Sequence, residues 1–348
     1  MTNRPATLPL YDWAMALASL WISGGILYDA WHHFHETIET FFETGHAVLY
    51  AGLLASFVFT GIAVWYNSRR GYTWRDALPR GYETTLAGLG VFLLGGVLDL
   101  IKHTLWGFEE GFNALVSPSH LVIGAGMFLI IAGPISAALT RKERPQTLLA
   151  QLPMIAAAAS MMELLHWGTQ FVFPSAAEQM NAPLALGAFS HDTLTLLALD
   201  YYKQGIGLIS VVVQSLLLAG FAIYLARRIR IAAGGYTVLL VLGNVFVAGA
   251  QSNYAGQFAA VLLASAAAGI CADAIAVGPQ SSKRRFVLFS FSIPAAYWIV
   301  MLGVLAATMG GLWWTPDIIS GSVLFAGLSG LFLNAVASRT EDSDPRRA

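Results

Sequence analysis

Residues 24–52 read GGILYDAWHHFHETIETFFETGHAVLYAG. This stretch joins the end of one apolar run, 10–34, to the start of the next, 43–66, through a short polar turn. Each run is long enough for a transmembrane helix, which needs about 20 largely apolar residues. The sequence therefore predicts a transmembrane helical hairpin whose turn is rich in histidine and glutamate.

The same kind of run recurs along the whole chain of 348 residues, which is 56% hydrophobic and only 11% charged. A soluble domain usually has roughly 25% charged residues, so this composition excludes an ordinary water-soluble enzyme. We predict an all-α, polytopic helical bundle in the membrane. Its ten expected spans are 10–34, 43–66, 82–105, 118–139, 147–172, 204–226, 236–251, 256–277, 286–308 and 318–338, the seventh being the shortest.

Basic residues fall in every second loop between these spans. All of the 19 lysines and arginines except Lys102 and Lys203 lie on one side of the expected topology. The positive-inside rule makes that side cytoplasmic, which predicts a multi-pass protein of the cell membrane with both termini inside. The formal net charge is only -1, so we expect the lipid bilayer and not nucleic acid as the partner.

The histidines collect on the opposite, non-cytoplasmic side. All eight lie in the first 191 residues, at His32, His33, His35, His46, His103, His120, His166 and His191. We therefore divide the chain into a metal-site half, 1–203, and a histidine-free half, 204–348. The second half has little polar content, so we expect it to be a scaffold or an interface with a cytoplasmic tail.

An internal repeat organises the histidines into three helical hairpins. In the first two, an Asp and a His at positions i and i+4 share one face of a helix end, and a second His begins the returning helix. A weaker third copy has Glu and His at i and i+3. The candidate metal ligands are Asp29, His33 and His46; Asp99, His103 and His120; and Glu163, His166 and His191.

Asp29 and Asp99 lie inside expected spans, where an unpaired carboxylate costs about 2.5–3.5 kcal/mol at the centre of the membrane. Pairing with histidine or with a metal would offset that cost. The chain has a single cysteine, Cys271, so thiolate-rich clusters are excluded within one chain. Imidazole and carboxylate ligands suit copper, zinc, iron or manganese, and the ligand types alone do not choose among these metals.

Other polar and aromatic residues near this face have simpler expected roles. We expect solvated or helix-capping positions for Glu36, Glu39, Glu43, Glu109 and Glu110. For the aromatic residues we favour the belt found at membrane interfaces over the wall of a cavity. These are Trp31, Phe34, Phe41, Phe42, Trp106, Phe108, Phe112, Trp167 and Phe171.

The motif Asp29-x3-His33-x12-His46, at the outer ends of two consecutive spans, resembles the Asp/His/His copper site in the C subunit of the particulate methane and ammonia monooxygenase family. The resemblance covers this hairpin. It implies copper at Asp29, His33 and His46, an oxidoreductase that hydroxylates a small apolar substrate, and other membrane subunits as partners. A homo-oligomer is the alternative assembly.

Two other functions are compatible with the sequence. A metal-ion permease or delivery protein would use the outer cluster as an entry site and continue through polar residues deeper in the membrane, among which Asp273 stands out. A b-type cytochrome would pair histidines from different helices across a haem. In the cytochrome, Asp29 and Asp99 would orient the histidines without binding iron.

Overall fold

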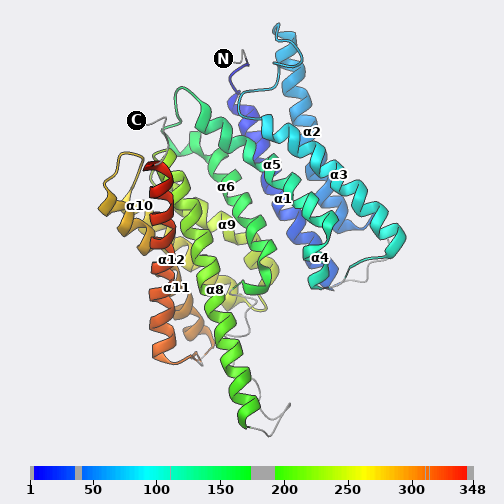
Figure 1. The fold of residues 1–348 in the computed structure, drawn as a ribbon. Helices are drawn as coiled ribbons and strands as arrows, with labels where there is room; N and C mark the ends of the chain where they lie inside the picture. The colour runs from blue at the N-terminus through cyan, green and yellow to red at the C-terminus, as the bar shows by residue number, and fades with distance from the viewer. Residues whose placement is uncertain are drawn as a thin grey trace. The chain divides into compact units, whose positions relative to one another are not determined.

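The computed structural model describes residues 4–35, 41–109, 111–173, 193–309, 311–312 and 314–342. Within these ranges every regular element is a helix, which confirms the expected all-α class (Figure 1). The helices are α1 (Pro9–His35), α2 (Thr44–Arg69), α3 (Glu83–Trp106), α4 (Phe112–Val116), α5 (Pro118–Thr140), α6 (Leu148–Gly168), the 3-10 turn η1 (Gln170–Val172), α8 (Thr193–Arg228), α9 (Gly235–Gln251), α10 (Ala255–Ile275), α11 (Lys283–Met309) and α12 (Pro316–Asp342).

Nine helices in the described part of the chain are long and apolar enough to cross a membrane, so the protein is a multi-pass membrane protein. The remaining expected span, 236–251, corresponds to α9, which has 17 residues. Such a helix rises about 25 Å, a little less than the ~30 Å thickness of a hydrocarbon core. Helix α8 begins at Thr193, inside the segment 173–203 between two expected spans.

The chain forms two compact units, Met1–Gly168 and Thr169–Ala348. The first contains α1 to α6, and the second contains the helices from α8 onward. The division expected at residue 203 is based on where the histidines lie in the sequence, whereas these units are defined by packing. The expected division into a metal-site half and a scaffold half stays a prediction.

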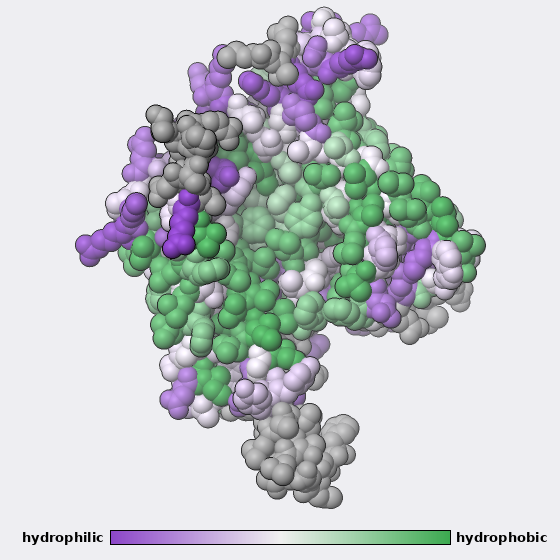
Figure 2. Space-filling view, in the orientation of Figure 1, coloured by the Kyte–Doolittle hydropathy of each residue, from purple (hydrophilic) through white to green (hydrophobic). Residues whose placement is uncertain are grey.

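The first unit is built from two helical hairpins. Helix α1 packs on α2, and α3 packs on α5 after the short helix α4; α6 then contacts both α1 and α5. Figure 1 shows the α1–α2 turn and the α4 turn at the same end of this unit. Large apolar side chains on α2 and α3 stay exposed, and Figure 2 shows apolar surface over these helices, as expected for surfaces in contact with lipid.

A buried polar network joins the helices at the other end of the first unit. The Tyr82 hydroxyl donates a 2.7 Å hydrogen bond to the Asp12 carboxylate, which also forms an ion pair with Arg141. Asp12 lies on α1, Tyr82 precedes α3, and Arg141 follows α5. A buried charge of this kind is tolerated because it is paired and hydrogen-bonded. The network fixes the hairpins to each other far from the histidine-rich turns.

In the second unit, α9 and α10 contact each other along an antiparallel hairpin. Asp273 on α10 accepts hydrogen bonds from the backbone N–H groups of Tyr236 and Thr237, at 3.2 and 3.1 Å, and from the Thr237 hydroxyl at 2.7 Å. A carboxylate is stabilised at a helix N-terminus, where backbone N–H groups lack partners within the helix. Asp273 therefore caps α9.

Close approach of α3 and α5 depends on glycine. A Cβ atom at Gly126 would collide with the backbone of Phe92 on α3, whereas a Cβ atom at Gly124 would meet nothing within 4 Å. Small residues of this kind let membrane helices pack backbone to backbone. The two glycines lie on the same helix but face different surroundings.

We predict that Gly126→Ala lowers the thermal unfolding temperature of the detergent-solubilised protein. Overpacking of a tight contact costs typically about 1–3 kcal/mol. Gly124→Ala, the matched control, should leave the temperature unchanged or raise it, because alanine favours a helix over glycine by roughly 0.5–1 kcal/mol. Equal behaviour of the two variants would contradict the close approach of α3 and α5.

Candidate metal centre

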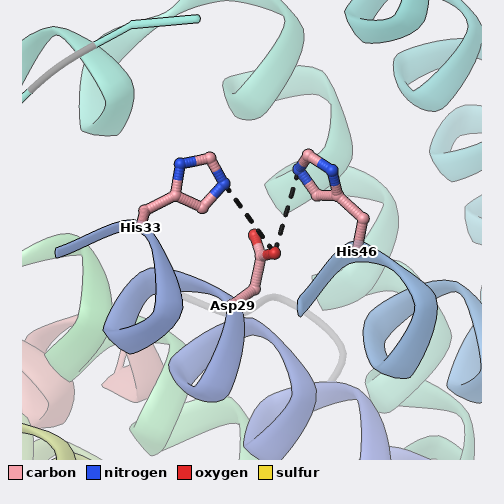
Figure 3. A group of neighbouring side chains, drawn as sticks. All are labelled: Asp29, His33 and His46. Carbon is pink, nitrogen blue, oxygen red and sulfur yellow. Dashed lines mark ion pairs between the residues drawn. The ribbon is translucent and has the colours of Figure 1, made fainter. Parts of the chain in front are cut away.

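The first hairpin brings together Asp29, His33 and His46 (Figure 3). Asp29 and His33 lie one turn apart near the end of α1, and His46 lies in the first turn of α2. The Asp29 Oδ1 atom is 3.9 Å from His33 Nε2 and 3.8 Å from His46 Nε2. Asp29 and His46 are buried and His33 is half-buried. Gly45 makes this contact possible, because a Cβ atom there would collide with Asp29.

The second hairpin repeats this arrangement at closer distances. Asp99 and His103 lie one turn apart on α3, and His120 lies in the first turn of α5. The Asp99 Oδ1 atom is 3.4 Å from His103 Nε2 and 3.1 Å from His120 Nε2, and it accepts a 2.8 Å hydrogen bond from the Ser119 hydroxyl. Asp99 is only 1% exposed.

The two sets form one continuous cluster. One ligand atom from each of His46, Asp99 and His103 lies within 4.8 Å of the others, so the first hairpin touches the second through α2 and α3. The His46 and His103 ring centroids are 6.1 Å apart. The repeat in the sequence predicts two separate carboxylate–imidazole sets, but nothing in their spacing indicates that the sets meet.

Backbone carbonyl groups fix the orientation of three of the imidazoles. His46 Nδ1 lies 2.8 Å from the Phe41 carbonyl oxygen, His103 Nδ1 lies 3.2 Å from that of Gly107, and His120 Nδ1 contacts that of Ala114. A carbonyl oxygen only accepts hydrogen bonds, so each Nδ1 atom carries a proton. In the neutral imidazole Nε2 then has a lone pair, and this lone pair faces a carboxylate oxygen.

This arrangement needs a cation. A neutral Nε2 atom and an ionised carboxylate oxygen are both acceptors, so a proton or a metal ion has to lie between them. Histidine ligands of metals usually donate the other ring N–H to a carbonyl or carboxylate, which holds the ring in place. The donor set of two carboxylates and four imidazoles therefore fits a metal ion of the first transition series.

Glu109 extends the cluster beyond the residues selected from the sequence. It forms a group with His103 and His120, and its carboxylate lies 3.6 Å from His103 Nδ1 and forms an ion pair with Lys102. Its side chain is 10% exposed, so the solvated position expected for Glu109 is wrong. The signal in the sequence is Lys102, one of two lysines expected on this side, because a nearby carboxylate such as Glu109 would pair with it.

Two phenylalanine rings cover the imidazoles. Phe108 stacks on His103 with ring centroids 4.3 Å apart, and Phe41 lies 4.8 Å from His46. Phe41 precedes α2 and Phe108 follows α3. Both contact imidazoles of the cluster, which an interfacial belt does not require, and their apolar rings limit the access of water to the ligands.

The remaining candidates are those of the third hairpin. Glu163 and His166 are buried in α6, but no group of three candidate ligands among the described residues includes them. His191 lies outside the described residues, as do Glu36, Glu39 and Glu110. The role of the third hairpin as a ligand source stays a prediction.

Comparisons of the chain with protein-family models, with curated proteins and with solved structures found no match. The resemblance to the monooxygenase C subunit is therefore carried by the motif of the first hairpin alone.

We predict that Ser119→Ala destabilises the metal-free protein, because the buried Asp99 carboxylate loses a hydrogen-bond donor. The loss of one partner of a buried polar group costs about 1–3 kcal/mol. Unfolding in detergent with a chelator present would measure it. Thr104→Ala is the control, because the exposed Thr104 hydroxyl bonds only to Leu100 of its own helix. A stability equal to that of the control variant would contradict the Ser119–Asp99 interaction.

Proposed function

We propose that this protein is a membrane metalloenzyme in which the two hairpins bind copper and oxidise a small apolar substrate. The observation that carries the proposal is the orientation of the imidazoles. Carbonyl groups hold His46, His103 and His120 with Nδ1 protonated, and their Nε2 atoms converge on Asp29 and Asp99. Each hairpin has its own carboxylate, and we propose one ion at each of them.

A metal explains the burial of this cluster better than protonated histidines do. Burying several ion pairs carries a desolvation cost that their mutual attraction often does not repay. Metal binding uses neutral imidazole and ionised carboxylate together, and it adds its own binding energy to the stability of the folded chain. The two hairpins differ in the length of their turns, but each brings one carboxylate and two imidazoles together. The recurrence of this arrangement supports a role in binding an ion.

Copper is proposed ahead of zinc, iron and manganese for two reasons. Nitrogen and oxygen ligands without thiolate suit Cu(II), which has the highest affinity of the common divalent metals for such sites. The motif of Asp29, His33 and His46 also resembles the copper site of the particulate monooxygenase C subunit. Zinc, iron and manganese use the same ligand types, so binding of each of these metals is measured beside that of copper.

The position of the cluster indicates the class of substrate. The ligands lie at the ends of membrane-spanning helices, and Phe41 and Phe108 cover them. Bound copper would supply one-electron redox chemistry with dioxygen. Hydroxylation of a C–H bond consumes one dioxygen, two protons and two electrons from an external reductant and releases one water. The protein contributes fixed ligands and an apolar surrounding that admits a membrane-soluble substrate.

The permease alternative has less support. Polar residues deeper in the helices bond locally: Asn244 donates to the Leu240 carbonyl group, Gln151 donates to that of Pro145, and Asp273 caps α9. Each of these contacts holds a polar group to a nearby backbone, which is a structural role.

The haem alternative also fits less well. The Nε2 atoms of His103 and His120 both face the same oxygen of Asp99, at 3.4 and 3.1 Å. A porphyrin between these imidazoles would have to displace the carboxylate.

We predict that wild-type protein purified from copper-supplied cells retains copper after dialysis. Asp29→Asn and Asp99→Asn should each lose the ion of their own hairpin and keep the other, because asparagine preserves volume but removes the negative charge. Elemental analysis measures the metal, and nitrogen hyperfine structure in the Cu(II) resonance spectrum identifies the imidazoles. Asp317→Asn, on the exposed start of α12, is the control.

A folded wild-type protein that binds none of the four metals would contradict the metal centre. Retention of zinc, iron or manganese with no affinity for copper would contradict the copper assignment and leave the site in place.

We also propose that the cluster faces the non-cytoplasmic side, because all of the 19 lysines and arginines except Lys102 and Lys203 are expected at the other ends of the spans. In a Cys271→Ser background, Phe42→Cys in the α1–α2 turn should react with an impermeant maleimide in intact cells. Trp74→Cys in the α2–α3 loop should react only after permeabilisation. Phe42 and Trp74 are 83% and 75% exposed, so access to the reagent decides the result. The reverse labelling pattern would overturn this orientation.

A further inference from the structure

Tyr50 lies one helical turn after His46 on the same face of α2. Its ring centroid is 6.4 Å from that of His46 and 5.9 Å from that of Phe41. The Tyr50 ring centroid is also 5.7 Å from that of Phe92 on α3. Tyr50 therefore lies beside the junction where the two hairpins meet. It is not one of the proposed metal ligands.

The Tyr50 hydroxyl is buried and has no hydrogen-bond partner among the described residues. A buried hydroxyl usually finds a partner, because leaving it without one costs free energy. The Nδ1 atoms of the neighbouring imidazoles donate to carbonyl groups, so they do not accept a hydrogen bond from this hydroxyl. Since none of the described residues bonds to this hydroxyl, we look for its partner outside the chain.

Gly96 on α3 makes room for the hydroxyl. A Cβ atom at this position would lie 2.8 Å from the Tyr50 oxygen, and Gly96 precedes Asp99 by one turn. The tyrosine is also unique to one copy of the repeat, because Gly124 occupies the equivalent position four residues after His120. The two hairpins thus offer the same ligands, but only the first adds a phenol.

We propose that the Tyr50 hydroxyl donates a hydrogen bond to a small exogenous ligand, a water or an anion, held by the metal centre at the junction of the hairpins. This inference rests on the proposed metal centre. Tyr50 then acts as a ligand-binding residue that does not coordinate the metal. It favours ligands that place a hydrogen-bond acceptor atom beside α3. The two ions should therefore differ in their affinity for such ligands.

Azide is the probe for this interaction, because it binds Cu(II) and changes its absorption spectrum. Copper-loaded wild-type protein and Tyr50→Phe should contain the same amount of copper. The azide dissociation constant of Tyr50→Phe should be about tenfold higher, as expected for the loss of one hydrogen bond to a charged ligand. Tyr28→Phe is the matched control, because Tyr28 is a half-exposed tyrosine next to Asp29 in the sequence.

A second pair of variants moves the hydroxyl without removing it. Gly96→Ala should displace the Tyr50 side chain and weaken azide binding as Tyr50→Phe does. Gly90→Ala on the same helix, where a Cβ atom meets nothing within 4 Å, should not.

The outcomes separate this inference from the metal centre. Wild-type azide affinity in copper-loaded Tyr50→Phe, or in Gly96→Ala, would overturn the role of Tyr50 and leave the metal centre intact. A wild-type protein that binds no metal would overturn both proposals.

Discussion

The burial of two carboxylates at the ends of membrane helices is the constraint on which the first unit depends. Asp29 and Asp99 are 8% and 1% exposed, in a part of the chain where solvation by water is limited. An uncompensated charge in such a place is costly, so each carboxylate has to be surrounded by groups that neutralise or hydrogen-bond it. The imidazoles and Ser119 do this.

The packing of the hairpins follows from this requirement. Gly45 lets the start of α2 approach Asp29, and Gly126 lets α5 lie against the backbone of α3. Each close approach brings a returning histidine to the carboxylate of the preceding helix. The turns between the helices then supply the carbonyl groups that hold the imidazole rings, through Phe41 in the first hairpin and through Gly107 and Ala114 in the second. The geometry of the site therefore depends on the hairpin turns as well as on the ligand residues.

Local spacing explains what the sequence predicted well and what it did not. Apolar runs predict most helices within a few residues, although α8 begins at Thr193 and its expected span begins at 204. The i, i+4 spacing places Asp29 with His33 and Asp99 with His103 on one face. The meeting of His46 with His103 depends on a contact between α2 and α3 that no local pattern encodes. The burial of Glu109 likewise depends on how the turn after α3 folds back. The capping role of Asp273 needed the position of the neighbouring helix α9.

The two hairpins are alike in sequence but differ in their surroundings. Asp99 is held by Ser119 and lies within 3.4 Å of both of its imidazoles, whereas Asp29 is 3.8 and 3.9 Å from its own. The His33 side chain is 20% exposed, and that of His103 is 2% exposed. The second set is the tighter one, but exposure does not separate the two sets, because the His46 side chain is 6% exposed and that of His120 is 18% exposed. The repeat therefore supplies two versions of one candidate ligand set, which differ in how closely the carboxylate approaches its imidazoles.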